Sequence, residues 1–194
     1  MVKTKIAVLV SGGGTNLQAL LDAQAAGKIP HGEITLVISN KDGVYALTRA
    51  ANAGVASAVV TGSDFEQKLQ VLLESNGIDM IILAGFLKIL SADFTAKWPK
   101  RILNIHPSLI PSFCGEGYYG LRVHEEALRY GVKVTGATVH YVNEVPDGGE
   151  IIAQKAVDIL PGDTAAVLQR RVMEQAEWVL LPQAAEIVAE LLSR

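Results

Sequence analysis

The sequence contains a single cysteine, few aromatic residues, no marked excess of charge of either sign and no long hydrophobic run. One cysteine, Cys114, rules out an internal disulfide framework and any zinc site built from paired cysteines, and it favours the reducing cytoplasm. A net charge of −3 argues against a protein built chiefly to bind nucleic acid. The apolar runs are shorter than the roughly 18 residues of a membrane span, and residues 1–6 lack a signal-peptide core, so we expect no membrane association.

The composition that remains is typical of one globular α/β domain, which we expect to cover residues 1–194. Strand-length apolar runs alternate with amphipathic helical stretches from the first residues onward. This alternation predicts a doubly wound, mainly parallel, Rossmann-like sheet with helices on both faces. The expected strands are 5–10, 34–38, 57–60, 80–83 and 102–105, and the expected helices are 16–26, 45–53, 65–75 and 91–97.

The pattern changes after residue 105. Residues 106–120 form a loop of a length that is usually functional in a compact domain. A short helix over 121–130 and two apolar stretches, 134–142 and 151–157, follow, and we expect the two stretches to add an antiparallel edge to the sheet. The last segment, 164–193, is predicted to be a long amphipathic helix interrupted or kinked at Pro182.

A glycine-rich segment, Ser11-Gly12-Gly13-Gly14-Thr15-Asn16, joins the first strand to the first helix, where backbone N–H groups and the helix dipole favour an anion. It lacks the Gly-Lys-Ser/Thr of a Walker A motif, and Leu17 stands where a dinucleotide fingerprint needs its third glycine. The second expected strand also ends without the acidic residue of nicotinamide enzymes. A phosphate cradle is the favoured interpretation. The alternative is a plain turn in which Thr15 or Asn16 caps the helix.

A second polar cluster follows the fifth expected strand. Asn104 and His106 alternate with apolar residues, so their side chains project to the same side at the carboxyl end of a parallel strand, where open α/β sheets bind ligands. A neutral N–H donor beside an imidazole suits an acyl transfer that develops an oxyanion. Asp147, in a Pro-Asp-Gly-Gly turn, could join them. The alternatives are a histidine that caps a loop and an aspartate that only forms a turn.

Other chemically versatile side chains carry weaker signals. His124 and His140 do not have metal-ligand spacing with each other or with Cys114, so we predict no metal site. Cys114 has no neighbour in the sequence that would activate it as a nucleophile.

Four segments together resemble the phosphoribosylglycinamide formyltransferases, also called GAR transformylases, the folate-dependent enzymes of purine synthesis. They are SGGGTNLQ at 11–18, LAGF followed by ILS within 83–91, NIHPSLIP at 104–111, and GATVHYV leading to DGG within 136–149. The resemblance runs nearly end to end. Its most specific part is Asn-x-His-Pro-Ser-Leu.

The resemblance implies a formyl transfer from 10-formyltetrahydrofolate, as co-substrate, to glycinamide ribonucleotide. It implies a catalytic triad of Asn104, His106 and Asp147, in which His106 acts as general acid and base. The residues implied for the ribonucleotide are Gly12, Gly13, Gly14, Thr15, Asn16 and Glu177. Those implied for folate are Leu87, Lys88, Ile89, Leu90, Asn104, Asn143, Glu144, Val145 and Asp147. The partners are then small molecules, bound by a monomer or homodimer with a phosphate-binding part over about 1–100, a catalytic and folate-binding part over about 83–160 and a C-terminal helix.

The chain departs from the family pattern at three places. Lys88 stands where the family often has arginine, and Pro146 replaces an aliphatic residue before the aspartate. Residues 175–178 differ from the common Glu-His pair and contain one apparent extra residue.

Three other functions compete with this one. Methionyl-tRNA formyltransferase and formyltetrahydrofolate deformylase share the Asn-x-His-Pro-Ser region but usually carry a further domain, which we do not expect in this chain. The third is a non-catalytic module that binds a nucleotide phosphate through the glycine loop alone. Formyl transfer by the purified protein would separate these functions.

Overall fold

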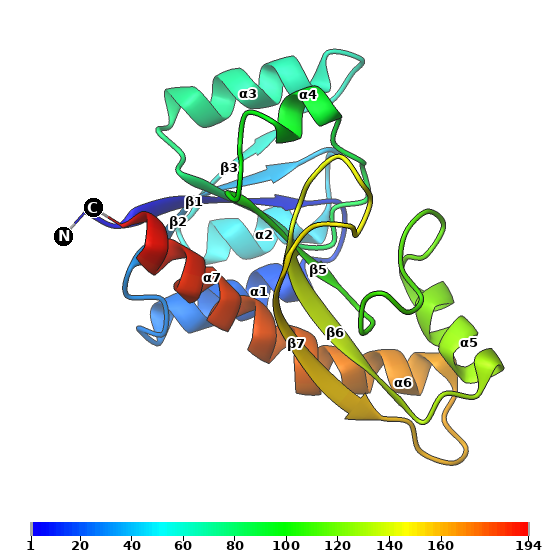
Figure 1. Ribbon diagram of the computed structural model, residues 1–194. Coiled ribbons are helices and arrows are strands. Elements are labelled where there is room, and N and C mark those ends of the chain that lie inside the picture. Colours follow the sequence, from blue (N-terminus) through cyan, green and yellow to red (C-terminus); the bar gives the residue numbers. More distant parts are fainter. Residues whose placement is uncertain (1, 194) are drawn as a thin grey trace.

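The structure is a computed structural model that describes residues 2–193 (Figure 1). Its strands are β1 (Thr4–Val10), β2 (Gly32–Ser39), β3 (Ala56–Val59), β4 (Met80–Leu83), β5 (Ile102–His106), β6 (Val134–Tyr141) and β7 (Ile151–Asp158). Its helices are α1 (Thr15–Ala25), α2 (Tyr45–Asn52), α3 (Phe65–Ser75), α4 (Ala92–Thr95), α5 (Leu121–Tyr130), α6 (Ala165–Val172), the π-helical turn η1 (Met173–Glu177) and α7 (Trp178–Leu192). Within residues 2–193, no helix is both long enough and apolar enough to cross a membrane.

The strands form one sheet in the order β3-β2-β1-β4-β5-β6-β7. Strands β1 to β5 pair in parallel, whereas β6 runs antiparallel to both β5 and β7. The predicted fold class, a mainly parallel sheet with an antiparallel edge addition, is therefore confirmed. The strand order reverses between β1 and β4, and the crevice at such a reversal is where open α/β sheets bind ligands.

Two apolar clusters cover the two faces of the sheet because side chains alternate along each strand. In β1, Ile6, Val8 and Val10 face a cluster that includes residues of α1, α2, α6 and α7, whereas Ala7 and Leu9 face residues of α3 and α4. Figure 1 shows α3 and α4 on one side of the sheet and α1 and α7 on the other. Burial of each large apolar side chain stabilises such an arrangement by about 1.5–3 kcal/mol.

The C-terminal helical segment differs from its prediction in the position of its irregularity. Thr164 caps its first turn, because its Oγ1 accepts a hydrogen bond from the Val167 N–H at 3.3 Å. The interruption lies in η1 at 173–177 rather than at Pro182, which is inside α7. A π turn spans one residue more per hydrogen bond than an α turn, so it can accommodate the extra residue noted in the sequence. Pro182 follows one turn later and leaves the Trp178 carbonyl without its usual helical donor.

Candidate active site

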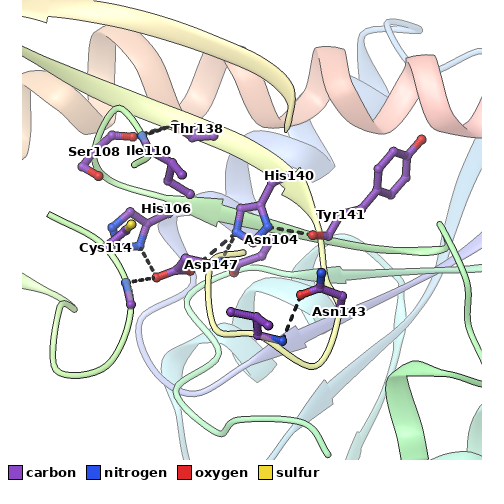
Figure 2. A network of polar contacts seen from close by, with 12 residues as sticks. Asn104, His106, Ser108, Ile110, Cys114, Thr138, His140, Tyr141, Asn143 and Asp147 are labelled. Carbon is purple, nitrogen blue, oxygen red and sulfur yellow. Dashed lines mark hydrogen bonds and ion pairs between the residues drawn. The ribbon is translucent and has the colours of Figure 1, made fainter. Parts of the chain in front are cut away.

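The candidate catalytic residues meet at the carboxyl end of β5 (Figure 2). Asn104 and His106 project from β5, and Asp147 approaches them from the connection between β6 and β7. The Asn104 amide donates to Asp147 Oδ1 at 3.4 Å, and His106 Nδ1 lies 3.4 Å from Asp147 Oδ2. Asp147 has a φ of 54°, which an aspartate tolerates better than most residues. The structure thus brings together the three side chains that the sequence singled out.

His106 is almost completely buried, with 4% of its surface exposed. Its Nε2 lies 2.9 Å from the carbonyl oxygen of Phe113, which can only accept, so Nε2 carries a proton. Burial lowers the pKa of His106, whereas the negative charge of Asp147 and the Phe113 carbonyl act in the opposite direction. A second proton, on Nδ1, would complete an ion pair with Asp147. This histidine can therefore exchange a proton at the atom that faces the carboxylate.

Asp147 is held ionised by its neighbours. Burial alone would raise the pKa of its carboxyl group, but contacts with His140, the charge of His106 and the Gly115 N–H lower it below the ordinary value. The Gly115 N–H donates to Asp147 Oδ2 at 2.9 Å. The loop predicted at 106–120 therefore contributes two backbone groups to the site, the Phe113 carbonyl and this N–H.

His140 is a residue that our sequence reasoning missed. It lies opposite Asn104 in the antiparallel pairing of β5 and β6. Its Nδ1 lies 2.8 Å from the Tyr141 carbonyl oxygen, and its Nε2 lies 3.1 Å from the Asn104 amide nitrogen and 3.5 Å from Asp147 Oδ1. His140 therefore orients Asn104. Only the strand register reveals this role, because from the sequence His140 was considered only as a candidate metal ligand.

Cys114 and His124 flank the site without polar contacts to the triad. The Cys114 thiol donates to the Pro111 carbonyl at 3.3 Å, and burial together with Asp147 raises the pKa of the thiol, which disfavours a nucleophilic thiolate. His124 of α5 is fully buried, and neither of its ring nitrogens has a hydrogen-bond partner among the described residues.

The glycine loop is bent at Gly14, which adopts a left-handed conformation with φ 73° and forms the N-cap of α1. No side chain caps this helix within the described structure, so the alternative with Thr15 or Asn16 as cap is not realised. Asn16 instead donates from Nδ2 to Glu177 Oε2 at 2.7 Å. Glu177 is 7% exposed, and burial raises the pKa of its carboxyl group while the Asn16 hydrogen bond lowers it. The predicted phosphate loop and the predicted ribose acid are therefore in direct contact.

Two cavities adjoin the triad. The larger, of about 620 Å³, is lined by residues expected for both substrates: Thr15, Asn16, Leu87, Lys88, Ile89, Asn104, His106, Asp147 and Glu177. The smaller, of about 120 Å³, is lined on the folate side by Lys88, Ile89, Leu90, Asn104, Asn143, Glu144, Val145 and Asp147. Gly12, Gly13 and Gly14 border neither cavity in the described structure. Leu87 and Ile89 are 60% and 68% exposed, so two apolar side chains of this wall are open to solvent.

Among residues 2–193, one group of potential metal ligands lies away from the triad. His31, Glu186 and Glu190 bring their ligand atoms within 4.8 Å of one another near the end of α7. Glu186 already binds His31 through both the imidazole and the backbone N–H. These residues do not line the cavities beside the triad.

Known proteins resemble this chain over most of its length. Residues 4–184 match the model of the formyl transferase family. The phosphoribosylglycinamide formyltransferase of Haemophilus influenzae is 43% identical over 92% of this chain and 84% of its own length. The human trifunctional purine biosynthetic protein adenosine-3 is 44% identical over 96% of this chain, but the chain spans only 18% of that protein.

Solved structures show the same fold. Glycinamide ribonucleotide transformylase 1 from Symbiobacterium toebii has a TM-score of 0.89 and 40% identity, over 97% of this chain and 88% of the other. A formyltetrahydrofolate deformylase from Pseudomonas syringae has a TM-score of 0.87 at 24% identity, over 97% of this chain and 62% of the other, a likeness that extends to the fold alone. Because the family model covers nearly all of the sequence, the chain belongs to the formyl transferase family.

Proposed function

We propose that this protein transfers the formyl group of 10-formyltetrahydrofolate to the amine of glycinamide ribonucleotide, a step of purine biosynthesis. One observation carries the proposal: Asp147 contacts both Asn104 and His106 in the wall of a cavity that also reaches Glu177 and the start of α1. Relatives named for this reaction cover most of the chain, which supports the same substrates here.

The reaction begins when the ribonucleotide amine attacks the formyl carbon. The carbonyl oxygen then gains negative charge, which hydrogen-bond donors stabilise. In this proposal the Asn104 amide and the protonated His106 become such donors by turning an N–H from its present acceptor, Asp147 or the Phe113 carbonyl, toward the formyl oxygen, and Asp147 stabilises the imidazolium. The carbon–nitrogen bond to folate then breaks. The amine loses a proton and the folate nitrogen gains one, with His106 and Asp147 relaying it.

The two substrates bind on different sides of the triad in this proposal. The ribonucleotide phosphate binds at the glycine loop, Gly12 to Asn16, and its ribose at Glu177. Folate lies along Leu87, Lys88, Ile89 and Leu90 and against Asn143, Glu144 and Val145. The triad is between them. Lys88 is exposed and brings a positive charge to the folate side. Its ammonium nitrogen lies over the Phe65 ring, 4.5 Å from the ring centroid.

Formyl transfer is distinguished from its rivals by one assay. Conversion of 10-formyltetrahydrofolate to tetrahydrofolate is followed spectroscopically with and without glycinamide ribonucleotide. We expect conversion only when the ribonucleotide is present. Conversion without it would identify a deformylase, and ribonucleotide binding without conversion would identify a binding module.

We also propose a cytoplasmic protein that acts as a monomer or homodimer on these small molecules. The lone cysteine supports the cytoplasmic location, and the absence of an excess of basic residues supports small molecules rather than nucleic acid as partners. Cell fractionation and sedimentation of the purified chain test it, and recovery with nucleic acid or membranes would contradict it.

A further inference from the structure

Helix α2 anchors the glycine loop from behind. The backbone N–H of Ala46 donates to the Gly12 carbonyl at 3.2 Å, and Arg49 Nε donates to the Gly13 carbonyl at 2.8 Å. A Cβ on Gly14 would lie 2.7 Å from the Ala46 Cβ, so the two segments are in close contact. The carbonyls of two successive peptide groups are therefore fixed toward α2.

This anchoring determines where the N–H groups of the loop point. In a trans peptide, the carbonyl and the N–H of the same group point in opposite directions. With the Gly12 and Gly13 carbonyls bound to α2, the N–H groups of Gly13 and Gly14 face away from α2. An anion on that side meets donors that need no reorganisation.

Arg49 also brings a positive charge that the loop itself lacks. Residues 11–16 include no charged side chain. Arg49 Nη1 donates to Gln18 Oε1 of α1 at 2.9 Å, and the guanidinium lies over the Tyr45 ring at 4.8 Å from the centroid. Among residues 2–193, no carboxylate pairs with Arg49. Its charge is therefore available to polarise the Gly13–Gly14 peptide, which strengthens that N–H as a donor.

We infer that Arg49 is a positioning residue for the phosphate monoester of the ribonucleotide. It acts through the Gly13 carbonyl rather than by direct contact, and its side chain lines a separate groove of about 590 Å³ between α1 and α7. Thr15, at the start of α1, borders both this groove and the larger cavity of the active site. The inference rests on the proposed function only for the identity of the substrate, because the loop geometry concerns the phosphate alone.

The test measures binding by calorimetry with three probes: ribose 5-phosphate, glycinamide ribonucleotide and tetrahydrofolate. Arg49→Gln keeps a donor but removes the charge, and Arg49→Lys keeps the charge but removes the planar fork. Arg129→Gln is the matched control, because Arg129 is exposed on α5 and pairs with Glu126. Each protein is checked by circular dichroism and thermal unfolding.

We expect Arg49→Gln to bind both phosphates about tenfold more weakly than the wild type at low salt, with a smaller loss on raising the salt. The phosphate affinity of Arg49→Lys should lie between those of the wild type and Arg49→Gln, and it should keep the salt dependence of the wild type. Tetrahydrofolate affinity should not change, and Arg129→Gln should match the wild type. A merely structural role for Arg49 would weaken all three ligands together.

Phosphate affinities of Arg49→Gln within about twofold of the wild type would overturn the inference. If Arg49→Gln does not fold, the phosphate affinities of Arg49→Lys and Gln18→Ala test the inference instead. Wild-type phosphate affinity in both of these variants would also overturn it. Binding of ribose 5-phosphate that depends on Arg49, without formylation of the ribonucleotide, would leave the inference standing and refute the proposed function. A wild type that binds no phosphate refutes both.

Discussion

Asp147 is the residue on which the site converges. Its two oxygens are shared among the Asn104 amide, the His106 imidazole and the Gly115 N–H, and His140 Nε2 lies 3.5 Å from Oδ1. A carboxylate that accepts from several partners stays ionised in spite of burial. It can therefore stabilise a neighbouring imidazolium without taking the proton permanently.

We predict that His106→Ala and Asp147→Asn lower turnover by about 10²- to 10⁴-fold while the fold remains intact, because both groups act on the transferred proton. Steady-state kinetics measure the loss, and circular dichroism monitors the fold. His31→Ala serves as the control, because His31 is bound to Glu186 away from the triad. Turnover like that of the wild type in either variant would remove that residue from the mechanism.

Asn104 is expected to act through its charge distribution rather than its shape. Asn104→Asp keeps the size of the side chain but replaces a donor with a negative charge beside Asp147 and the developing oxyanion. We predict at least the roughly 10²-fold loss of turnover that follows removal of one oxyanion donor. Single-turnover measurements separate this effect from binding. If Asn104→Ala retained nearly full activity, another group would have to stabilise the oxyanion.

The helices and strands could be predicted from the sequence, but the residues that contact them in the folded protein could not. The alternation of Asn104 and His106 predicted side chains on one side of β5, because a strand repeats every two residues. The position of His140 depends on the register between β5 and β6, which spacing along the chain does not contain. Pro182 suggested an interruption at its own position, but it lies inside α7, and the irregularity is the π turn at 173–177, where the sequence contains the extra residue.

The glycine loop offers a comparison between adjacent residues. A Cβ on Gly13 would meet nothing within 4 Å, whereas a Cβ on Gly14 would collide with Ala46. Gly14 also has a left-handed backbone conformation, which is disfavoured for residues other than glycine. We predict that Gly14→Ala destabilises the protein by at least about 1 kcal/mol, because both strain and overlap oppose it. Gly13→Ala should keep its stability but weaken ribonucleotide binding more than folate binding. Urea unfolding and calorimetry measure the two effects.

The loop would be purely structural if Gly13→Ala left both affinities unchanged. Equal losses for both ligands would have the same meaning. Competition by inorganic phosphate provides an independent check, since an anion held at a partly exposed helix end is displaced by another and is screened by salt.

At the scale of the whole molecule, the site is assembled from segments that are far apart in the sequence. Asn16 and Glu177 are separated by 161 positions yet form a buried hydrogen bond. The composition and the strand alternation sufficed to predict the sheet, but only the packing of α7 against α1 places Glu177 beside the glycine loop. The residues of the site came from the family resemblance and from strand-end positions, whereas their contacts required the structure.

Buried His124 links the stability of the whole molecule to pH. Burial, together with the nearby His106, lowers the pKa of His124 from 6.5 to about 4. In the unfolded chain, this histidine takes up a proton as the pH falls below about 6.5, whereas the folded protein resists protonation until about pH 4. The unfolded state therefore gains relative stability on acidification. Across this window we expect the folded protein to lose about 3 kcal/mol through this one group.

We predict that His124→Leu, which replaces the imidazole by an apolar side chain of similar size, removes the loss of folding stability that His124 causes at acid pH. The free energy of unfolding in urea is measured for both proteins at several values between pH 4.5 and 8. The difference between variant and wild type should shift in favour of the variant as the pH falls, because only the wild type has a buried imidazole that the unfolded state can protonate. A difference that does not vary with pH would show that His124 titrates alike in the folded and unfolded states, so that its burial has no part in acid unfolding.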